Sequence, residues 1–120
     1  MRRIFIAGVF VFLMTAGLLL TDIFFGLSTR YWWMDNVDHL LGGILAGLIG
    51  MWWGIALTKR NTLAYAIIGA FVLGALVEIV EYICGWGVSA FMSRSLDTSK
   101  DLIVDLFGGW VAWRFVLRNI

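Results

Sequence analysis

Three stretches of this 120-residue chain are apolar for about twenty residues each, at residues 4–25, 37–57 and 63–84. A helix of that length matches the roughly 30 Å hydrocarbon core of a membrane. With 62% hydrophobic and only 14% charged residues, a soluble domain this small could not bury its apolar surface. A fourth helix is expected at residues 99–117. The sequence therefore predicts a single all-α membrane domain, a polytopic antiparallel bundle of four transmembrane helices.

The first apolar stretch could be either a signal peptide or a membrane helix. Arg2 and Arg3 precede the first stretch, as in a secretory signal peptide, but that stretch is longer than the roughly 7–15 apolar residues of a signal peptide. We therefore expect it to remain as a membrane helix.

Residues 88–96 mix apolar residues with serines, which favours a short helix at the membrane surface. The single cysteine, Cys84, excludes an intramolecular disulfide and argues against a thiolate zinc site.

Charge is distributed unevenly between the two ends of the expected bundle. One end holds six basic residues and no acid: Arg2, Arg3, Lys59, Arg60, Arg114 and Arg118. The other end holds Arg30, Arg94, Lys100 and all eight acids. The positive-inside rule assigns the basic end to the cytoplasm, so both termini are expected to be cytoplasmic. The chain has no run of basic residues of the kind that binds nucleic acid.

Glycines recur at spacings of four in the second stretch, as Gly43 with Gly47 and Gly50 with Gly54. This spacing lets the backbone of a neighbouring helix approach closely, which is how many membrane helices pack. The pattern fits packing within the bundle and oligomerisation equally well.

Ionisable residues gather near one end of three stretches, at helical spacing. They are Asp35 and His39 in the second stretch, Glu78 and Glu81 in the third, and Asp97, Asp101 and Asp105 in the fourth. Ionisable groups at membrane depth are costly and usually mark a site. Counted from the aromatic residues expected at the membrane surface, His39, Glu81 and Asp105 all lie about 7–9 Å deep. We therefore expect one polar cluster in the outer half of the bilayer.

Several carboxylates at one level require a counter-charge, because like charges in a low dielectric disfavour ionisation. A divalent cation is one source, and oxygen donors with one imidazole favour calcium, magnesium or manganese. The candidate ligands are Asp38, His39, Glu78, Glu81, Asp101 and Asp105. Arg94 or Lys100 folding inward is a second source, and carboxylates that share protons are a third.

Other roles follow from position. His39 is a candidate general base as well as a ligand, with Asp35 orienting it. Asp97 and Thr98 are expected to cap the start of the fourth helix.

The ordered set of polar residues at 35 and 39, 78 and 81, and 97–108 resembles the VanZ-like family of small integral membrane proteins, in particular its YjdF-like branch. The resemblance covers about two thirds of the chain. It implies a multi-pass protein of a prokaryotic inner membrane and a family association with glycopeptide resistance. The family often has Gln where this chain has Glu81 and Asn where it has Asp105. These extra acids strengthen the expectation of a bound cation.

Three functions remain open on these grounds. The cluster could hold a divalent cation that acts on or binds an envelope lipid or another phosphate-bearing, lipid-linked headgroup. Alternatively, the chain could be an accessory or binding protein in which the cluster only fixes helix packing. Ion or proton translocation is the third, but no acid or histidine continues the pathway beyond Glu78 and Asp105. Whether the protein is an enzyme is undecided, since the chain has no nucleophile motif and no second histidine.

Overall fold

The computed structural model describes residues 1–60 and 63–119, and every regular element in these ranges is a helix. The helices are α1 (Arg2–Phe25), α2 (Leu27–Arg30), α3 (Met34–Thr58), α4 (Leu63–Cys84) and α5 (Arg94–Asn119). Three of them, α1, α3 and α4, are long and apolar enough to cross a membrane. The prediction of an all-α protein with apolar helices of membrane-spanning length is confirmed for these three.

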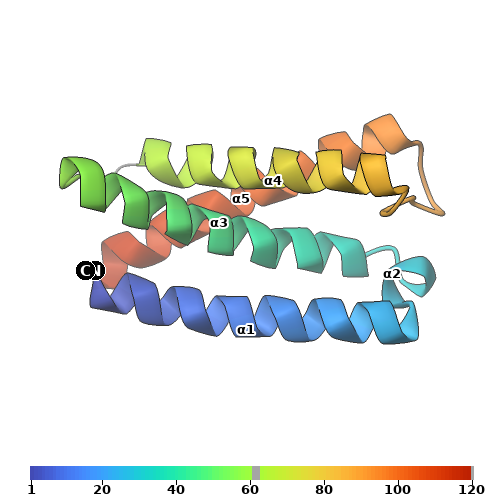
Figure 1. The fold of residues 1–120 in the computed structure, drawn as a ribbon, viewed down its shortest axis with the longest axis horizontal. Coiled ribbons are helices and arrows are strands. Elements are labelled where there is room, and N and C mark those ends of the chain that lie inside the picture. The colour runs from blue at the N-terminus through green and yellow to red at the C-terminus, as the bar shows by residue number, and fades with distance from the viewer. Residues whose placement is uncertain (61–62, 120) are drawn as a thin grey trace.

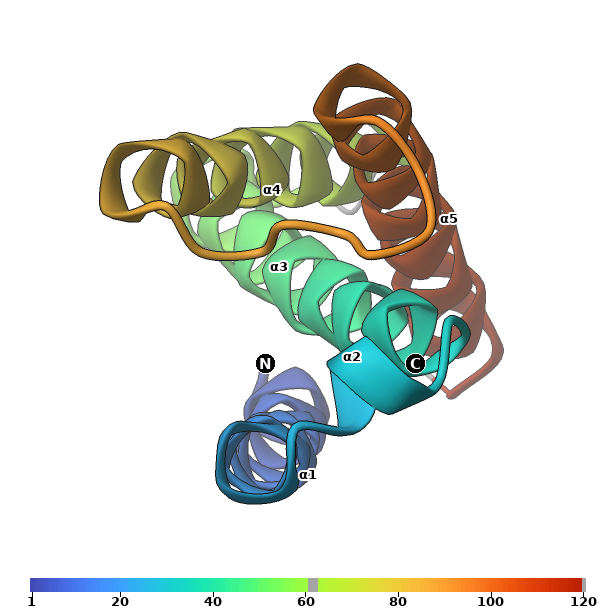
Figure 2. The ribbon, with the colours of Figure 1, turned by 90° about the vertical axis from the view of Figure 1, so that its right-hand side faces the viewer.

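The four long helices run along the long axis of the molecule, and α1 begins at the end where α5 finishes (Figure 1). We call this the basic end, because it carries the six basic residues named above. The opposite end, where α3 and α5 begin, is called the acidic end. Figure 2 looks onto the acidic end, where residues 86–93 cross from α4 to α5.

Two predictions about the segment before α5 are wrong. Residues 88–93 form no helix, so the expected surface helix at 88–96 is absent. The last helix begins at Arg94 rather than at residue 99, and its cap is neither Asp97 nor Thr98. Instead, the Ser93 hydroxyl accepts a hydrogen bond from the Leu96 amide at 3.4 Å. Serine is a preferred N-cap because its side chain satisfies an orphan amide of the first turn, so the helix starts earlier.

Glycines bring α3 and α5 into backbone contact. A Cβ atom at Gly43 would collide with the backbone of Asp105, and one at Gly47 would lie 2.8 Å from the Cα of Gly109. On α5, a Cβ at Gly108 would meet the backbone of α3 in the same way. Because no side chain stands between them, the two helices approach closely over this crossing.

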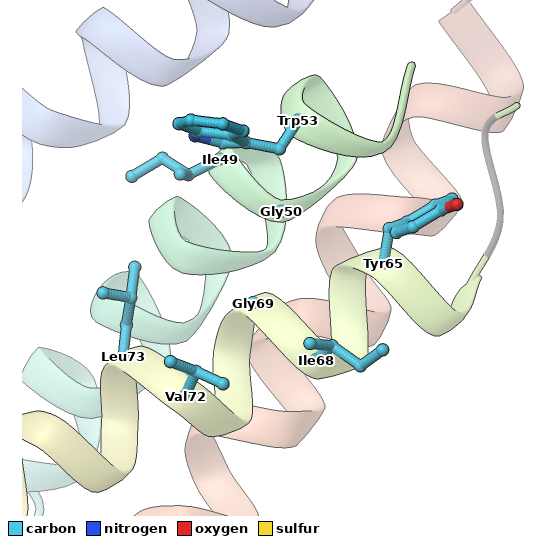
Figure 3. Close-up of a pocket in the computed structure, with 8 residues that line it drawn as sticks. All are labelled: Ile49, Gly50, Trp53, Tyr65, Ile68, Gly69, Val72 and Leu73. Carbon is cyan, nitrogen blue, oxygen red and sulfur yellow. The ribbon is translucent and has the colours of Figure 1, made fainter. Parts of the chain in front are cut away.

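The second pair of spaced glycines in α3, Gly50 and Gly54, packs against α4. A Cβ at Gly50 would collide with the backbone of Tyr65 and lie 3.0 Å from the Cα of Gly69. Figure 3 shows Gly50 and Gly69 on the facing sides of the two helices. Both glycine rows thus pack against helices of the same chain.

The first helix packs differently, because α1 contacts mainly α3 (Figure 2). Only 6% of the apolar stretch of α1 is buried inside the protein, and most of its large side chains are exposed. Near the basic end, Ile4 joins the buried apolar cluster, which also contains Leu48, Met51, Ala66, Ala112 and Val116. The helices α3, α4 and α5 therefore form a three-helix unit, to which α1 is added at one side.

Candidate functional site

His39 lies at the centre of a group of ionisable side chains near the acidic end. It is in the second turn of α3 and only 8% exposed. Its Nδ1 lies 3.4 and 3.5 Å from the two carboxylate oxygens of Asp105 on α5. Its Nε2 faces three further carboxylates: Asp101 at 3.5 Å, Asp35 at 3.7 Å and Glu78 at 3.9 Å. One imidazole thus contacts acids of three helices.

Lys100 supplies a positive charge on the side of the group nearest the start of α5. Its Nζ donates a hydrogen bond to Asp35 Oδ2 at 2.7 Å. The same nitrogen lies 3.0 Å from Asp101 Oδ1 and 3.1 Å from Asp97 Oδ1. Lysine can turn inward in this way because its flexible stem carries a compact charge with three donors.

Glu78 joins the group from α4. The Thr98 hydroxyl donates a hydrogen bond to Glu78 Oε2 at 2.7 Å, which ties α4 to the first turns of α5. The other oxygen, Oε1, is buried and accepts no hydrogen bond from the described residues. A buried carboxylate oxygen without a donor is costly, so this atom is available to a further ligand.

These side chains fit between the helices because small residues surround them. A Cβ on Gly74 of α4 would collide with the carboxylate of Asp105, and a Cβ on Gly43 would collide with the backbone of the same residue. Two glycines on two helices therefore make the space that Asp105 occupies. We use the term acidic cluster for the assembled group, which consists of Asp35, His39, Glu78, Asp97, Lys100, Asp101 and Asp105.

Three residues of the predicted site lie outside the acidic cluster. Asp38 precedes His39 in α3 and forms no hydrogen bond or ion pair with the cluster among the described residues; one of its carboxylate oxygens is buried without a hydrogen bond from these residues. The carboxylate of Glu81 packs against Gly87, in the segment between α4 and α5. Arg94 donates a hydrogen bond to the carbonyl oxygen of Trp86 and stacks over the ring of Tyr82. Of the two basic residues considered as counter-charges, only Lys100 forms ion pairs with acids of the cluster among the described residues.

The hydrogen-bond partner of His39 also differs from the prediction. Asp35 was expected to orient the imidazole, but its oxygen is 3.7 Å from Nε2, beyond hydrogen-bond distance. Asp105 makes the closer contact, at Nδ1. Asp105 is therefore the residue that orients the ring.

Three residues of the cluster could hold a metal ion, namely Asp35, His39 and Asp101. One ligand atom from each lies within 4.8 Å of the other two. Ligand atoms about 2.0–2.6 Å from one ion are at most about 5 Å apart, so the spacing fits a shared cation. The arrangement of His39, with one nitrogen toward a carboxylate and the other toward the candidate ligands, is typical of metal-bound histidines.

The sequence predicted Lys100 as a counter-charge, but it did not predict the hydrogen bond from Thr98 to Glu78. Thr98 was expected to act as a cap, and nothing in its spacing connects it with a glutamate 20 positions earlier. The signal for Lys100 was its position within the Asp97–Asp101 turn, where residues three apart share a helix face.

Comparisons of this chain with protein-family models, with curated proteins and with solved structures found no match.

Proposed function

We propose that this protein crosses a membrane with α1, α3, α4 and α5, and that its acidic cluster holds a divalent cation that binds a phosphate-bearing lipid headgroup. The observation that carries the proposal is the environment of His39. Its Nδ1 is held by Asp105, while its Nε2 faces carboxylates from three helices at 3.5–3.9 Å. One ligand atom from each of Asp35, His39 and Asp101 thus lies within 4.8 Å of the other two, which is close enough to share an ion.

The balance of charge supports a bound cation. The cluster contains five carboxylates but only one lysine and one histidine. Even with His39 protonated, five negative charges meet two positive charges. Asp101 and Asp105 are at most 4% exposed, so water screens them poorly. A divalent cation would offset most of the excess, because buried carboxylates without a counter-charge are strongly disfavoured.

The donor set favours particular ions. Asp35 and Asp101 offer oxygen, His39 offers one nitrogen, and Glu78 Oε1 lies close to the same nitrogen. Hard oxygen donors favour calcium, magnesium or manganese over zinc. These ions take six or more ligands, so coordination positions would remain for water or for a phosphate oxygen.

The position of the cluster supports a lipid ligand. His39 is six residues from Trp33, which places it about 9 Å below the aromatic residues that begin α3. That depth lies just beneath the headgroup layer. The six basic residues of the basic end favour a cytoplasmic position for both termini, so the cluster would open toward the outer leaflet. The VanZ-like resemblance is consistent with this membrane role and stays a prediction.

Metal analysis tests the proposal. We expect the detergent-purified protein, dialysed without chelator, to contain about one calcium, magnesium or manganese ion per chain. His39→Ala and Asp101→Asn should each lose the ion, because each removes one member of the three-residue group. Asp38→Asn is the matched control and should keep it. Absence of metal from the unaltered protein, together with no thermal stabilisation by any of the three ions, would reject the metal site.

A second candidate function is that of an accessory membrane protein in which the cluster has only a structural role. One observation favours it: Lys100 already bridges Asp35, Asp97 and Asp101. In this case, the charge of Lys100 and shared protons would suffice to hold the three helices. The His39→Ala variant separates the two proposals, because a purely structural cluster would lose stability in this variant without any change in metal content.

A further inference from the structure

A second region with a distinct chemistry lies between α1 and α3, away from the acidic cluster. It is a groove of about 370 Å³, lined only by apolar residues and glycine. From α1 it takes Gly8 and Phe12, and from α3 it takes Leu45, Ile49 and Trp52. Two residues of this lining, Ile49 and Trp53, also line a separate pocket between α3 and α4, which Figure 3 shows. A groove of this kind within a membrane must be occupied.

The length and position of the groove match one leaflet of a bilayer. On α1 it extends from Ile4 to Phe12, eight residues or about 12 Å. That is less than half of the roughly 30 Å hydrocarbon core. The groove therefore lies alongside the acyl chains of a single leaflet, the one at the basic end.

The charges at the mouth of the groove indicate what fills it. Arg2 lies two residues before Ile4, and Lys59 lies six residues after Trp53, at the C-terminal end of α3. Both side chains are exposed. The six basic residues of this end have no acid among them, and all eight acids of the chain lie toward the other end. A phosphate near Arg2 and Lys59 would gain from this charge without desolvating a buried group.

A second copy of this chain is the other obvious occupant, and charge argues against it. The positive-inside rule gives both copies the same orientation, so a neighbour in the groove would bring its own six basic residues to the same level. Like charges would then meet at the membrane surface. An anionic lipid supplies the opposite sign instead.

We propose that the groove between α1 and α3 is a binding site for an anionic glycerophospholipid, with one acyl chain along Gly8 and Ile49 and the phosphate near Arg2 and Lys59. This site is independent of the cation proposed for the acidic cluster. It also gives α1, which contacts mainly α3, an additional partner along its exposed side.

The structure offers a way to fill the groove without disturbing the protein. A Cβ atom on Gly8 would meet no other atom within 4 Å, so Gly8→Phe places a ring where the acyl chain is expected. Gly17 lies on the same helix, is equally open, and does not line the groove. Gly17→Phe is therefore a matched control for any effect of phenylalanine in α1.

The experiment is native mass spectrometry of the protein in detergent with an equimolar mixture of phosphatidylglycerol and phosphatidylcholine. We expect the unaltered protein to retain one phosphatidylglycerol at least several-fold more often than phosphatidylcholine. Gly8→Phe should reduce this retention about tenfold, and Gly17→Phe should leave it unchanged. The double variant Arg2→Gln with Lys59→Asn should bring retention of the two lipids close to equal; asparagine suits the left-handed conformation of Lys59, whose φ is 61°.

Three results would overturn the proposal. Equal retention of both lipids by the unaltered protein would mean that the basic residues do not select the headgroup. Unchanged phosphatidylglycerol retention in Gly8→Phe would place the lipid elsewhere, and a dimer in the same spectra that Gly8→Phe abolishes would show that a second copy fills the groove. The charge variant does not depend on how well Gly8→Phe folds, so it tests the proposal separately.

Discussion

Toward the basic end, α3, α4 and α5 meet through small residues, whereas toward the acidic end they meet through charged side chains. Gly47 lies against Gly109, and Gly50 lies against Gly69, with no side chain between the backbones. At the acidic end, His39, Glu78 and Asp105 place long polar groups between the same helices. The first kind of contact depends on shape, and the second depends on charge.

The two kinds of contact have different roles: the glycine contacts set the helix spacing, and the charged contacts can bind counter-charges. Close backbone contact fixes the distance between the helices, because any added atom collides with a neighbour. The charged contacts can then exchange one counter-charge for another without changing the helix positions. The comparison predicts that substitutions at the glycine contacts act on stability alone, whereas those in the acidic cluster depend on the ions in solution.

The largest expected effect is at the glycine contact of α3 with α5. Gly47→Ala should lower the free energy of unfolding by about 1–3 kcal/mol, because its Cβ would lie 2.8 Å from the Cα of Gly109. Gly42, on the same helix, has no atom within 4 Å of its Cβ position, so Gly42→Ala should be neutral or slightly stabilising. Unfolding in detergent checks both, with and without divalent cations. Equal stability of the two variants would contradict the role of backbone contact.

An intermediate effect is expected at Lys100. Lys100→Met keeps the stem but removes the charge that contacts Asp35, Asp97 and Asp101. We expect a loss of about 1–2 kcal/mol without divalent cations, since Lys100 is about a quarter exposed and water screens part of the interaction.

The response of this variant to cations distinguishes the two roles of the cluster. If a metal can replace the lysine charge, calcium, magnesium or manganese should restore the stability of Lys100→Met and bind it more tightly than the unaltered protein. Arg94→Met, which alters a basic residue outside the cluster, should show no such response. Loss of stability that no cation restores would favour a purely structural cluster.

The smallest effect is expected at the hydrogen bond between α4 and α5. Thr98→Val preserves the shape of the side chain but removes the donor to Glu78 Oε2, and should cost about 1 kcal/mol. Ser99→Ala removes a hydroxyl that bonds only within α5, so a change well below that is expected. Thermal unfolding of the two variants gives the comparison, and it fails if Ser99→Ala is the more damaging.

Much of the fold was predictable because helix length and apolar composition are local properties. Residues 63–84 form a helix with the predicted bounds, and α3 extends the predicted 37–57 by a few residues at its start. The start of α5 was not predicted, because Arg94 and Ser95 are polar and the competing cap at Ser93 depends on a single hydroxyl. That α5 is a fourth membrane helix stays a prediction, because α5 is not among the three helices that are apolar enough to cross a membrane.

The sequence predicted that a cluster of ionisable residues forms, but it did not predict which residues belong to it. Spacing along each helix predicted His39, Glu81 and Asp105 at one level, whereas the structure brings Glu78, and not Glu81, together with Asp105 at His39. Spacing did not separate Glu78 from Glu81: residues three apart differ by about 60° around a helix, and that angle turns Glu81 toward Gly87. Asp38 is about 100° from His39 in the same way. Which of two nearby ionisable residues on a helix faces the cluster depends on where the neighbouring helix crosses.

The residues that meet in the acidic cluster are far apart along the chain, and this separation affects how the protein is made. Asp105 follows His39 by 66 positions, and Lys100 follows Asp35 by 65. At about 5–20 residues per second, a ribosome needs about 3–13 s to add that much chain. During this interval α3 is already made, while the lysine and the aspartates of α5 are not. Asp35 and His39 therefore gain these partners only after α5 has been made, so the acidic cluster can be completed only at the end of synthesis.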